Sequence, residues 1–187
     1  NLYEAAERLR ARRIVISECG HGYRSTRWEG YTWAGYDQKL PTESVVAVLR
    51  RYLEEGRIAV DPGRNPEPVT FHDSCNIARS GDLVEEPREV LRRVCADFRE
   101  MHPNRQENFC CTGGGGLLAM AEYRPLRLEA GKVKAEQLKA TEAALVCTMC
   151  HNCIDGLGDV IKHYHLPMRV VQVLELVSRA LVLPARS

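Results

Sequence analysis

The chain has 187 residues, and its hydrophobic fraction of 44% is enough for a packed core without cross-links. Its formal net charge is +1, so charge favours neither nucleic acid nor an anionic membrane surface, and we expect no nucleic-acid partner. Its eight cysteines are too sparse for a disulfide scaffold but numerous for a reducing compartment, where such residues usually serve metal or redox chemistry.

The first residues show no signal-peptide pattern, and no stretch approaches the roughly 18 apolar residues of a membrane span. We therefore expect a cytoplasmic location. Any link to a membrane is expected to run through a partner subunit.

The predicted elements alternate between helices and short apolar strands. The first of them are a helix over 3–12, a strand over 13–17, a loop over 18–22, irregular chain over 28–36 and a helix over 41–55. Thr42 is the expected cap of that last helix and Gly56 its stop. After a proline-rich turn, the later elements are a strand over 69–72, helices over 86–101 and 129–140, a strand over 143–146, and helices over 158–165 and 170–183. This order predicts an α/β fold.

Two parts of this order resemble each other. Residues 6–11 are similar to residues 135–140, and each stretch leads into a short apolar strand and then a cysteine, Cys19 in one case and Cys147 in the other. We therefore predict two related lobes with cysteine-bearing loops at strand ends. The first lobe is expected to be incomplete, because its opening strands are absent. The predicted lobes are the C-terminal half of a degenerate repeat over 1–60 and a complete repeat over 61–187.

Five cysteines carry the most specific pattern in the chain. They are spaced Cys75-x34-Cys110-Cys111-x35-Cys147-x2-Cys150. Adjacent cysteines do not form an unstrained disulfide with each other, but two neighbouring thiolates can bind one multi-iron cluster. The glycines that follow, Gly113 and Gly114 among them, would let the backbone approach a bulky inorganic core and donate N–H groups to its sulfurs.

Other interpretations of these cysteines stay open. Free cysteine is a common core residue, so five unrelated buried thiols are one alternative. The stretch from Cys147 to His151 matches the c-type haem pattern, which requires an exported protein and leaves the earlier cysteines unexplained. Together with Cys153, the same stretch could hold zinc.

The remaining cysteines and histidines have weaker signals. Cys153 is a spare ligand, a redox-active thiol near the cluster or a structural residue, and Cys95 is expected to lie inside a helix and to pack in the hydrophobic core. Cys19 is a relic of a lost ligand set or a thiol facing the substrate cleft. His21 could shuttle protons at near-neutral pH, whereas His72 is expected to hydrogen-bond a loop carbonyl.

The cysteine spacing, with the segments 72–79 and 109–116, resembles the cysteine-rich CCG domain of heterodisulfide reductase catalytic subunits. In detail these segments look similar to the K subunit of the dissimilatory sulfite reductase-associated membrane complex. The resemblance implies an iron–sulfur redox domain with a non-cubane [4Fe–4S] cluster. The ligands that it implies are Cys75, Cys110, Cys111, Cys147 and Cys150.

The same resemblance implies a substrate and partners. The enzyme would reduce or form a disulfide or trisulfide on a small sulfur-carrier protein of the DsrC type, through that carrier's C-terminal cysteines. Electrons would pass through a ferredoxin-type domain and a membrane cytochrome subunit at the inner face of the membrane. The sequence does not set the direction of electron flow.

Two departures from the family pattern matter. Thr112 stands where most relatives have a glycine after the cysteine pair, so the glycine turn is expected to shift by one residue. Relatives also carry a ferredoxin domain and a fuller first repeat, so the chain is expected to be a fragment or a split subunit. The alternative functions are an electron-relay module of a lactate- or glycolate-oxidising complex and a structural zinc domain.

Overall fold

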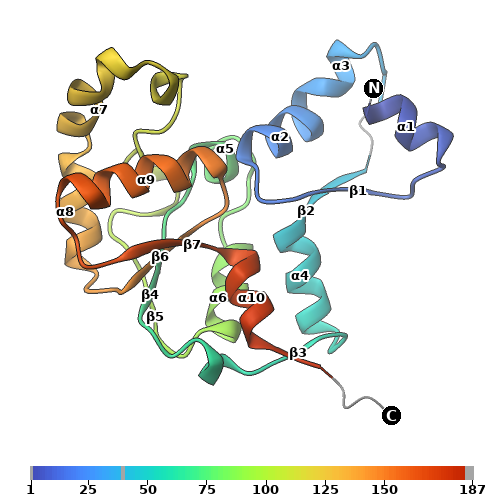
Figure 1. The fold of residues 1–187 in the computed structure, drawn as a ribbon. Helices are drawn as coiled ribbons and strands as arrows, with labels where there is room; N and C mark the ends of the chain where they lie inside the picture. Colours follow the sequence, from blue (N-terminus) through green and yellow to red (C-terminus); the bar gives the residue numbers. More distant parts are fainter. Residues whose placement is uncertain (1, 39–40, 184–187) are drawn as a thin grey trace.

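The computed structural model describes residues 2–38 and 41–183, and its centre is a parallel four-stranded sheet (Figure 1). The strand order is β5-β4-β6-β7. Each strand is short, and the register places Phe71 beside Cys147 and Cys147 beside Val171. The strands are β4 (Val69–Phe71), β5 (Phe98–Arg99), β6 (Leu145–Thr148) and β7 (Arg169–Gln172). The predicted α/β fold is confirmed.

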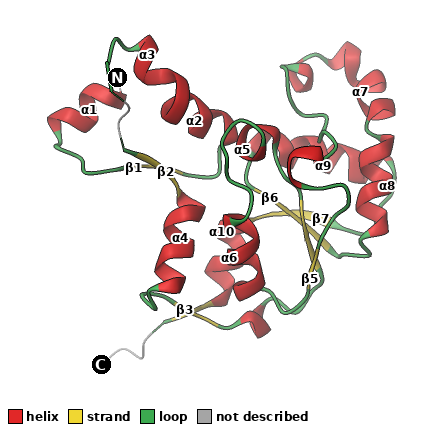
Figure 2. Ribbon diagram, turned by 180° about the vertical axis from the view of Figure 1, so that it is seen from behind, coloured by secondary structure: helices red, strands yellow, loops and turns green. Residues whose placement is uncertain are grey.

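Helices cover both faces of this sheet (Figures 1 and 2). On one face, α4 (Val45–Glu54), α6 (Glu86–Val94) and α10 (Val173–Ala180) pack against Val69, Phe71, Leu145, Cys147 and Val171. On the other, α7 (Arg124–Ala130), α8 (Lys132–Ala140) and α9 (His151–His163) pack around Val146 and Val170. Successive strand side chains point to opposite faces, so β6 and β7 each supply both hydrophobic clusters.

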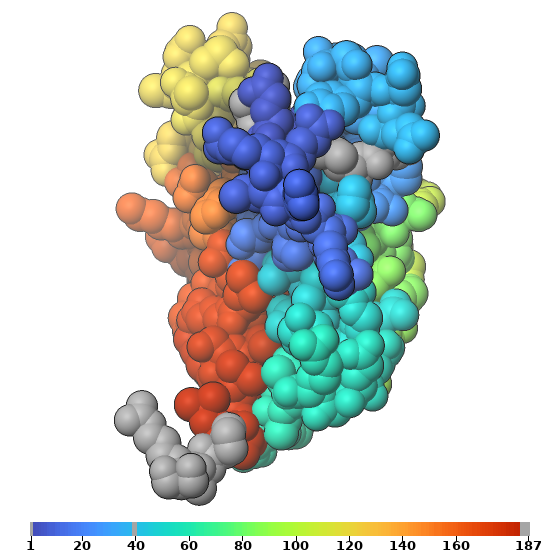
Figure 3. Space-filling model, turned by 90° about the vertical axis from the view of Figure 1, so that its right-hand side faces the viewer, coloured from blue at the N-terminus to red at the C-terminus, as the bar shows by residue number. Residues whose placement is uncertain are grey.

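The N-terminal residues form a smaller parallel pair beside the main sheet. Strands β1 (Ile14–Ile16) and β2 (Thr42–Ser44) align Ile14 with Thr42 and are linked through the short helices α2 (Gly20–Arg24) and α3 (Gly30–Trp33). Helix α1 (Leu2–Arg8) precedes this pair. Strand β3 (Ala59–Val60) pairs antiparallel with β8 (Leu181–Val182), and the space-filling view shows these teal and red residues in contact (Figure 3).

Several predicted boundaries are wrong, each for a local reason. The helix expected over 86–101 ends at Val94, because Cys95 is extended and leads toward β5. The apolar run from residue 170 begins as strand β7 and becomes helical only at Val173, since a short apolar run does not distinguish the two states. Ser44, not Thr42, caps α4 by accepting from the Val46 N–H.

Other differences concern where helices begin. Helix α9 starts at His151, seven residues before its predicted start, directly after the cysteine loop. The expected loop over 18–22 already contains the start of α2, and the expected irregular segment over 28–36 is largely helical. The helix predicted over 129–140 is two helices, α7 and α8, that meet at Gly131. Cys95 is buried, as predicted, but follows α6 rather than lying inside it.

Candidate metal centre

The candidate site lies at the carboxyl ends of β4 and β6, two neighbouring strands. Strand β4 is followed by Cys75, the first residue of α5 (Cys75–Ala78), and β6 is followed by Cys150, which caps α9. The connection after β4 leads to β5 on one side, whereas the connection after β6 leads to β7 on the other. Such a reversal opens a crevice at the carboxyl edge of a parallel sheet, where ligands usually bind.

Five thiols meet in this crevice. The Sγ atoms of Cys111 and Cys153 lie 3.2 Å apart. Cys75 and Cys110, Cys110 and Cys111, and Cys150 and Cys153 also lie near enough for each thiol to shift the pKa of its neighbour. The five side chains therefore form one continuous group, which draws on three separate segments of the chain.

Cys147, a predicted ligand, is not part of this group. It lies within β6, is fully buried and belongs to the cluster on the α6 and α10 face, whereas Cys111, Cys150 and Cys153 belong to the opposite cluster. Burial raises its pKa well above the usual thiol range, and the titratable groups near it are Glu18, Cys95 and Glu175. The physical reason is strand alternation, which turns this side chain away from the crevice. The pair that the structure brings together is Cys150-x2-Cys153.

Cys150 is the thiol best prepared to ionise among the three from its segment. A hydrogen bond from the Cys153 thiol, followed by backbone N–H groups of Gly20, Cys153 and Asn152, lowers its pKa to about 5. Cys150 stands at the N-terminus of a 13-residue helix, where unpaired N–H groups and the helix dipole favour negative charge. Thiolates are the form that binds metal.

The cysteine pair has one exposed and one buried member. Cys110 is exposed, and hydrogen bonds from the thiols of Cys111 and Cys75 lower its pKa. The Thr112 N–H also donates to the Cys110 sulfur over 3.3 Å. Cys111 is buried, and its bond to the Cys110 sulfur raises its pKa to about 11. The group is thus open to solvent at Cys110 and closed at Cys111.

Buried ion pairs fix the loop that carries Cys75. The Arg88 guanidinium makes a bidentate contact with Asp73 at 2.7 and 2.8 Å, and both side chains are at most 2% exposed. Asp73 also accepts from the Arg105 N–H at 2.6 Å. Arg79, which the sequence left without a role, donates to the Cys75 sulfur at 3.4 Å and to the Gln106 carbonyl at 2.6 Å. Its spacing of four residues from Cys75, just after a strand, was the available signal.

The residues after the cysteine pair have different roles from those predicted. A Cβ at Gly113 would collide with the Asn152 carbonyl, so this glycine serves close packing against α9, while Gly114 faces open space. The Gly113 N–H does donate to the Cys111 sulfur, over 3.4 Å. Thr112 itself takes a left-handed conformation, with φ +67°, which explains why a glycine would suit that position. The expected one-residue shift of the turn is therefore not needed.

Cys19 and His21 lie outside the thiol group. Cys19 caps α2, and its sulfur accepts from the Gly22 N–H at 3.3 Å. The neighbouring Gly20 reaches the site, since a Cβ there would lie 3.5 Å from the Cys150 sulfur. His21 is exposed on α2.

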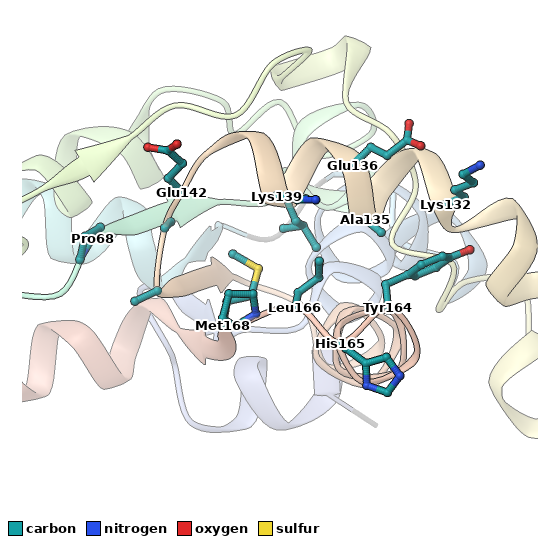
Figure 4. Close-up of a pocket in the computed structure, with 14 residues that line it drawn as sticks. Pro68, Lys132, Ala135, Glu136, Lys139, Glu142, Tyr164, His165, Leu166 and Met168 are labelled. Carbon is teal, nitrogen blue, oxygen red and sulfur yellow. The ribbon is translucent and has the colours of Figure 1, made fainter.

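A separate pocket of about 680 Å³ lies between α8 and the turn after α9 (Figure 4). Its lining includes Pro68, Ala144 and Met168, which immediately precede β4, β6 and β7. The pocket therefore lies at the amino ends of the strands, opposite the cysteine crevice.

Comparison with known proteins agrees with this geometry. Residues 69–157 match the family described as a cysteine-rich domain, CCG. This segment is a CCG domain. It includes all five thiols of the crevice, from Cys75 to Cys153.

Relatives with known names extend the similarity beyond this domain. The chain is 28% identical to the Hdr-like menaquinol oxidoreductase iron-sulfur subunit of Archaeoglobus profundus, over 98% of this chain and 40% of that protein. It is 26% identical to a subunit of the dihydromethanophenazine:CoB–CoM heterodisulfide reductase of Methanosarcina mazei, over 98% of this chain and 44% of that protein. It is 32% identical to a subunit of the fumarate reductase (CoM/CoB) of Methanothermobacter marburgensis, over 60% of this chain and 22% of that protein.

The chain thus spans less than half the length of these relatives. Within residues 2–38 and 41–183, each helix is too short or too polar to cross a bilayer.

Proposed function

We propose that the chain is the cluster-binding redox domain of a heterodisulfide-reductase-like subunit. The proposed ligands of a non-cubane [4Fe–4S] cluster are Cys75, Cys110, Cys111, Cys150 and Cys153. The observation that carries the proposal is the continuous group of five thiols in the crevice, together with the 3.2 Å separation of Cys111 and Cys153. The iron–sulfur names of the relatives support the cofactor class.

The donor set fits an iron–sulfur cluster. Thiolates are the soft anionic ligands that iron–sulfur clusters require. Five sulfurs exceed the four positions of a zinc tetrahedron, and adjacent cysteines suit a multi-iron core better than one ion. Cys153 takes the place that the sequence gave to Cys147, and Gly113 contributes by holding the Cys111 loop against α9.

The access to the site suits a sulfur substrate from solution. Cys110 is exposed and Cys75 is half-buried, whereas the other three thiols are buried. A partner's disulfide or trisulfide would therefore approach from the side of Cys110 and Cys75. Opening a disulfide consumes two electrons and two protons and yields two thiols, and the reverse reaction forms the disulfide. Bound to these thiols, the cluster would supply electrons one at a time and an iron site that accepts the released sulfur.

The electron donor and acceptor belong to other polypeptides or domains in this proposal. A small sulfur-carrier protein of the DsrC type, with C-terminal cysteines, is the proposed substrate. A ferredoxin-type domain and a quinol-linked membrane cytochrome subunit are the proposed electron partners at the inner face of the membrane. The menaquinol in the name of one relative supports the quinol link.

The test is the metal and sulfide content of the anaerobically purified chain, followed by electron paramagnetic resonance after oxidation. About four iron and four sulfide per chain, with a spectrum that changes when a small thiol is added, are expected. A cluster whose spectrum does not change when thiol is added would instead indicate an electron-relay module. Zinc without sulfide would support the structural alternative, for which the neighbouring His72, Cys111 and Cys153 offer a three-ligand set.

A further inference from the structure

A buried polar chain lies directly behind the thiol group. Lys134 is fully buried, and its Nζ donates to the Asn108 Oδ1 over 2.7 Å. Asn108, 3% exposed, is in turn 3.1 Å from the Nδ1 atom of the fully buried His72. Burying a polar side chain costs free energy unless it is hydrogen-bonded, so we expect each donor and acceptor in this chain to face a partner.

The lysine fixes the orientation of the asparagine amide. The Lys134 Nζ donates to the Asn108 Oδ1, so the amide oxygen faces the lysine. The amide nitrogen then faces the Asp73 carbonyl, which accepts from it, and the His72 ring. Both contacts are satisfied by one NH₂ group with two donors.

The asparagine in turn fixes the tautomer of the histidine. Because Asn108 donates to Nδ1, that ring nitrogen accepts and carries no proton. The single ring proton therefore resides on Nε2.

The protonated Nε2 atom lacks a partner among the described residues, although it is fully buried. One nitrogen of the ring lies within 4.8 Å of the Sγ atoms of both Cys111 and Cys153. Nδ1 is already engaged with Asn108, which leaves Nε2 as the ring nitrogen with a free donor. A buried donor left unpaired is expected to serve a group that binds there.

We propose that the His72 Nε2–H donates a hydrogen bond to sulfur of the cluster site at Cys111 and Cys153, and that Lys134, acting through Asn108, holds the ring in this tautomer. This inference rests on the proposed cluster. An N–H donor to sulfur stabilises the more negative, reduced state of a cluster and so raises its reduction potential. His72 is thus a positioning residue that tunes the cluster.

The test uses two variants that separate the two ring nitrogens. Gln in His72→Gln can place an amide N–H near the Nε2 position, whereas the shorter Asn in His72→Asn reaches only the Nδ1 position. His163→Asn, on an exposed histidine of α9, is the matched control. Iron and sulfide content, the midpoint potential and the exchangeable protons coupled to the cluster are measured for all four proteins.

The expected result is a lower potential for His72→Asn, near-complete rescue in His72→Gln and no change in the control. The expected shift is at least tenfold in the reduced-to-oxidised ratio at fixed potential, which equals about 59 mV for one electron. In the wild type, an exchangeable proton and a weak ¹⁵N-histidine coupling should be detected, and the coupled proton should be lost in His72→Asn.

Three outcomes would overturn the inference. If an iron-replete His72→Asn protein had an unchanged reduction potential, the proposed hydrogen bond would be wrong while the cluster proposal would still stand. A strong nitrogen coupling in the wild type would make His72 an iron ligand instead. Absence of sulfide in the wild type would remove both proposals together. If His72→Asn fails to assemble a cluster, the proton and nitrogen couplings of the wild type still decide.

Discussion

Two regions of this molecule have the same local design but different chemistry: the segment from β1 to α2 and the segment from β6 to α9. In each, a short strand leads to a cysteine that caps the next helix, Cys19 in the first and Cys150 in the second. In the first, the Cys19 sulfur accepts from the Gly22 N–H three residues later, whereas in the second the N–H three residues later, that of Cys153, donates to the Cys150 carbonyl oxygen. The side chain at that third position is the difference.

A cysteine at a helix N-terminus becomes part of a group of metal ligands only when a second thiol lies beside it. A cysteine at a helix N-terminus is held where a thiolate is favoured, whichever segment it belongs to. Only Cys153 adds a second sulfur next to the first, and that sulfur lies 3.2 Å from Cys111. Three residues before each cap stand Ile16 and Cys147, and both pack into the same hydrophobic cluster. Cys147 therefore occupies the place of an apolar core residue. This equivalence is consistent with the proposed relation between the two lobes.

The largest expected effect separates Cys153 from Cys147. Cys153→Ser should abolish or convert the cluster, because a proposed ligand is lost. Cys147→Ser should keep its iron and lose about 1–3 kcal/mol of stability, because a hydroxyl replaces a buried thiol in an apolar cluster. Iron content and urea unfolding measure both effects. If Cys147→Ser lost its iron while Cys153→Ser kept it, the ligands would instead be Cys147 and Cys150, as the spacing predicts.

The next largest effect concerns the packing of α9, in the segment from β6 to α9, against the loop that carries Cys110 and Cys111. Gly113→Ala should cost about 1–3 kcal/mol or more and disturb the site, because its Cβ would collide with the Asn152 carbonyl on α9. Gly114→Ala, where a Cβ meets open space, is the matched control. Denaturant midpoints and iron loading are the measurements, and equal behaviour of the two variants would contradict the close packing.

A third prediction uses the carboxylate that joins the first segment to α10. The Glu18 Oε1 accepts from the Val173 and Leu174 N–H groups at 2.7 and 3.2 Å, and burial raises the Glu18 pKa from 4.5 to about 7. The folded state then binds the proton more tightly, so this contribution to stability is present at low pH and lost as pH rises through about 7.

Glu18→Gln keeps an acceptor for both N–H groups and removes the titration. Above pH 7 the variant should be more stable than the wild type by up to about 3 kcal/mol, because the pKa rises from 4.5 to about 7 and one pKa unit corresponds to about 1.4 kcal/mol. Below pH 4.5 the difference should vanish. Unfolding free energies from pH 4 to pH 8 provide the test, and parallel curves for the two proteins would refute the shifted pKa.

The smallest effect tests whether Cys19 is only a cap. Cys19→Ser should preserve stability, because serine is a good cap, whereas Cys19→Ala should cost about 1 kcal/mol. Neither variant should change iron content, since Cys19 lies outside the thiol group. A loss of iron in Cys19→Ser would give the first segment a chemical role that the comparison denies it.

The sequence by itself determined the α/β class and the clustering of Cys75, Cys110 and Cys111, and it predicted an iron–sulfur centre. These follow from hydrophobic periodicity and from the adjacency of two cysteines, which are local properties of the chain. The sequence also located β4 and β6 to within a few residues, so the loops that end in cysteine were expected at the correct edge of the sheet.

Only the tertiary structure distinguishes the positions of Cys147 and Cys153 relative to the other thiols. Both stand three residues from Cys150, so the spacing of the cysteines does not show which of them lies beside Cys111. Cys147 is still inside β6, where alternation turns it toward α6 and α10, whereas Cys153 lies in the first turn of α9 and faces Cys111. The buried polar chain from Lys134 to His72 could not be predicted from the sequence either, because spacing does not show which side chains meet in space. Its members are 62 residues apart at the ends, and the contacts between them exist only because the helices of one face fold over the carboxyl ends of the strands.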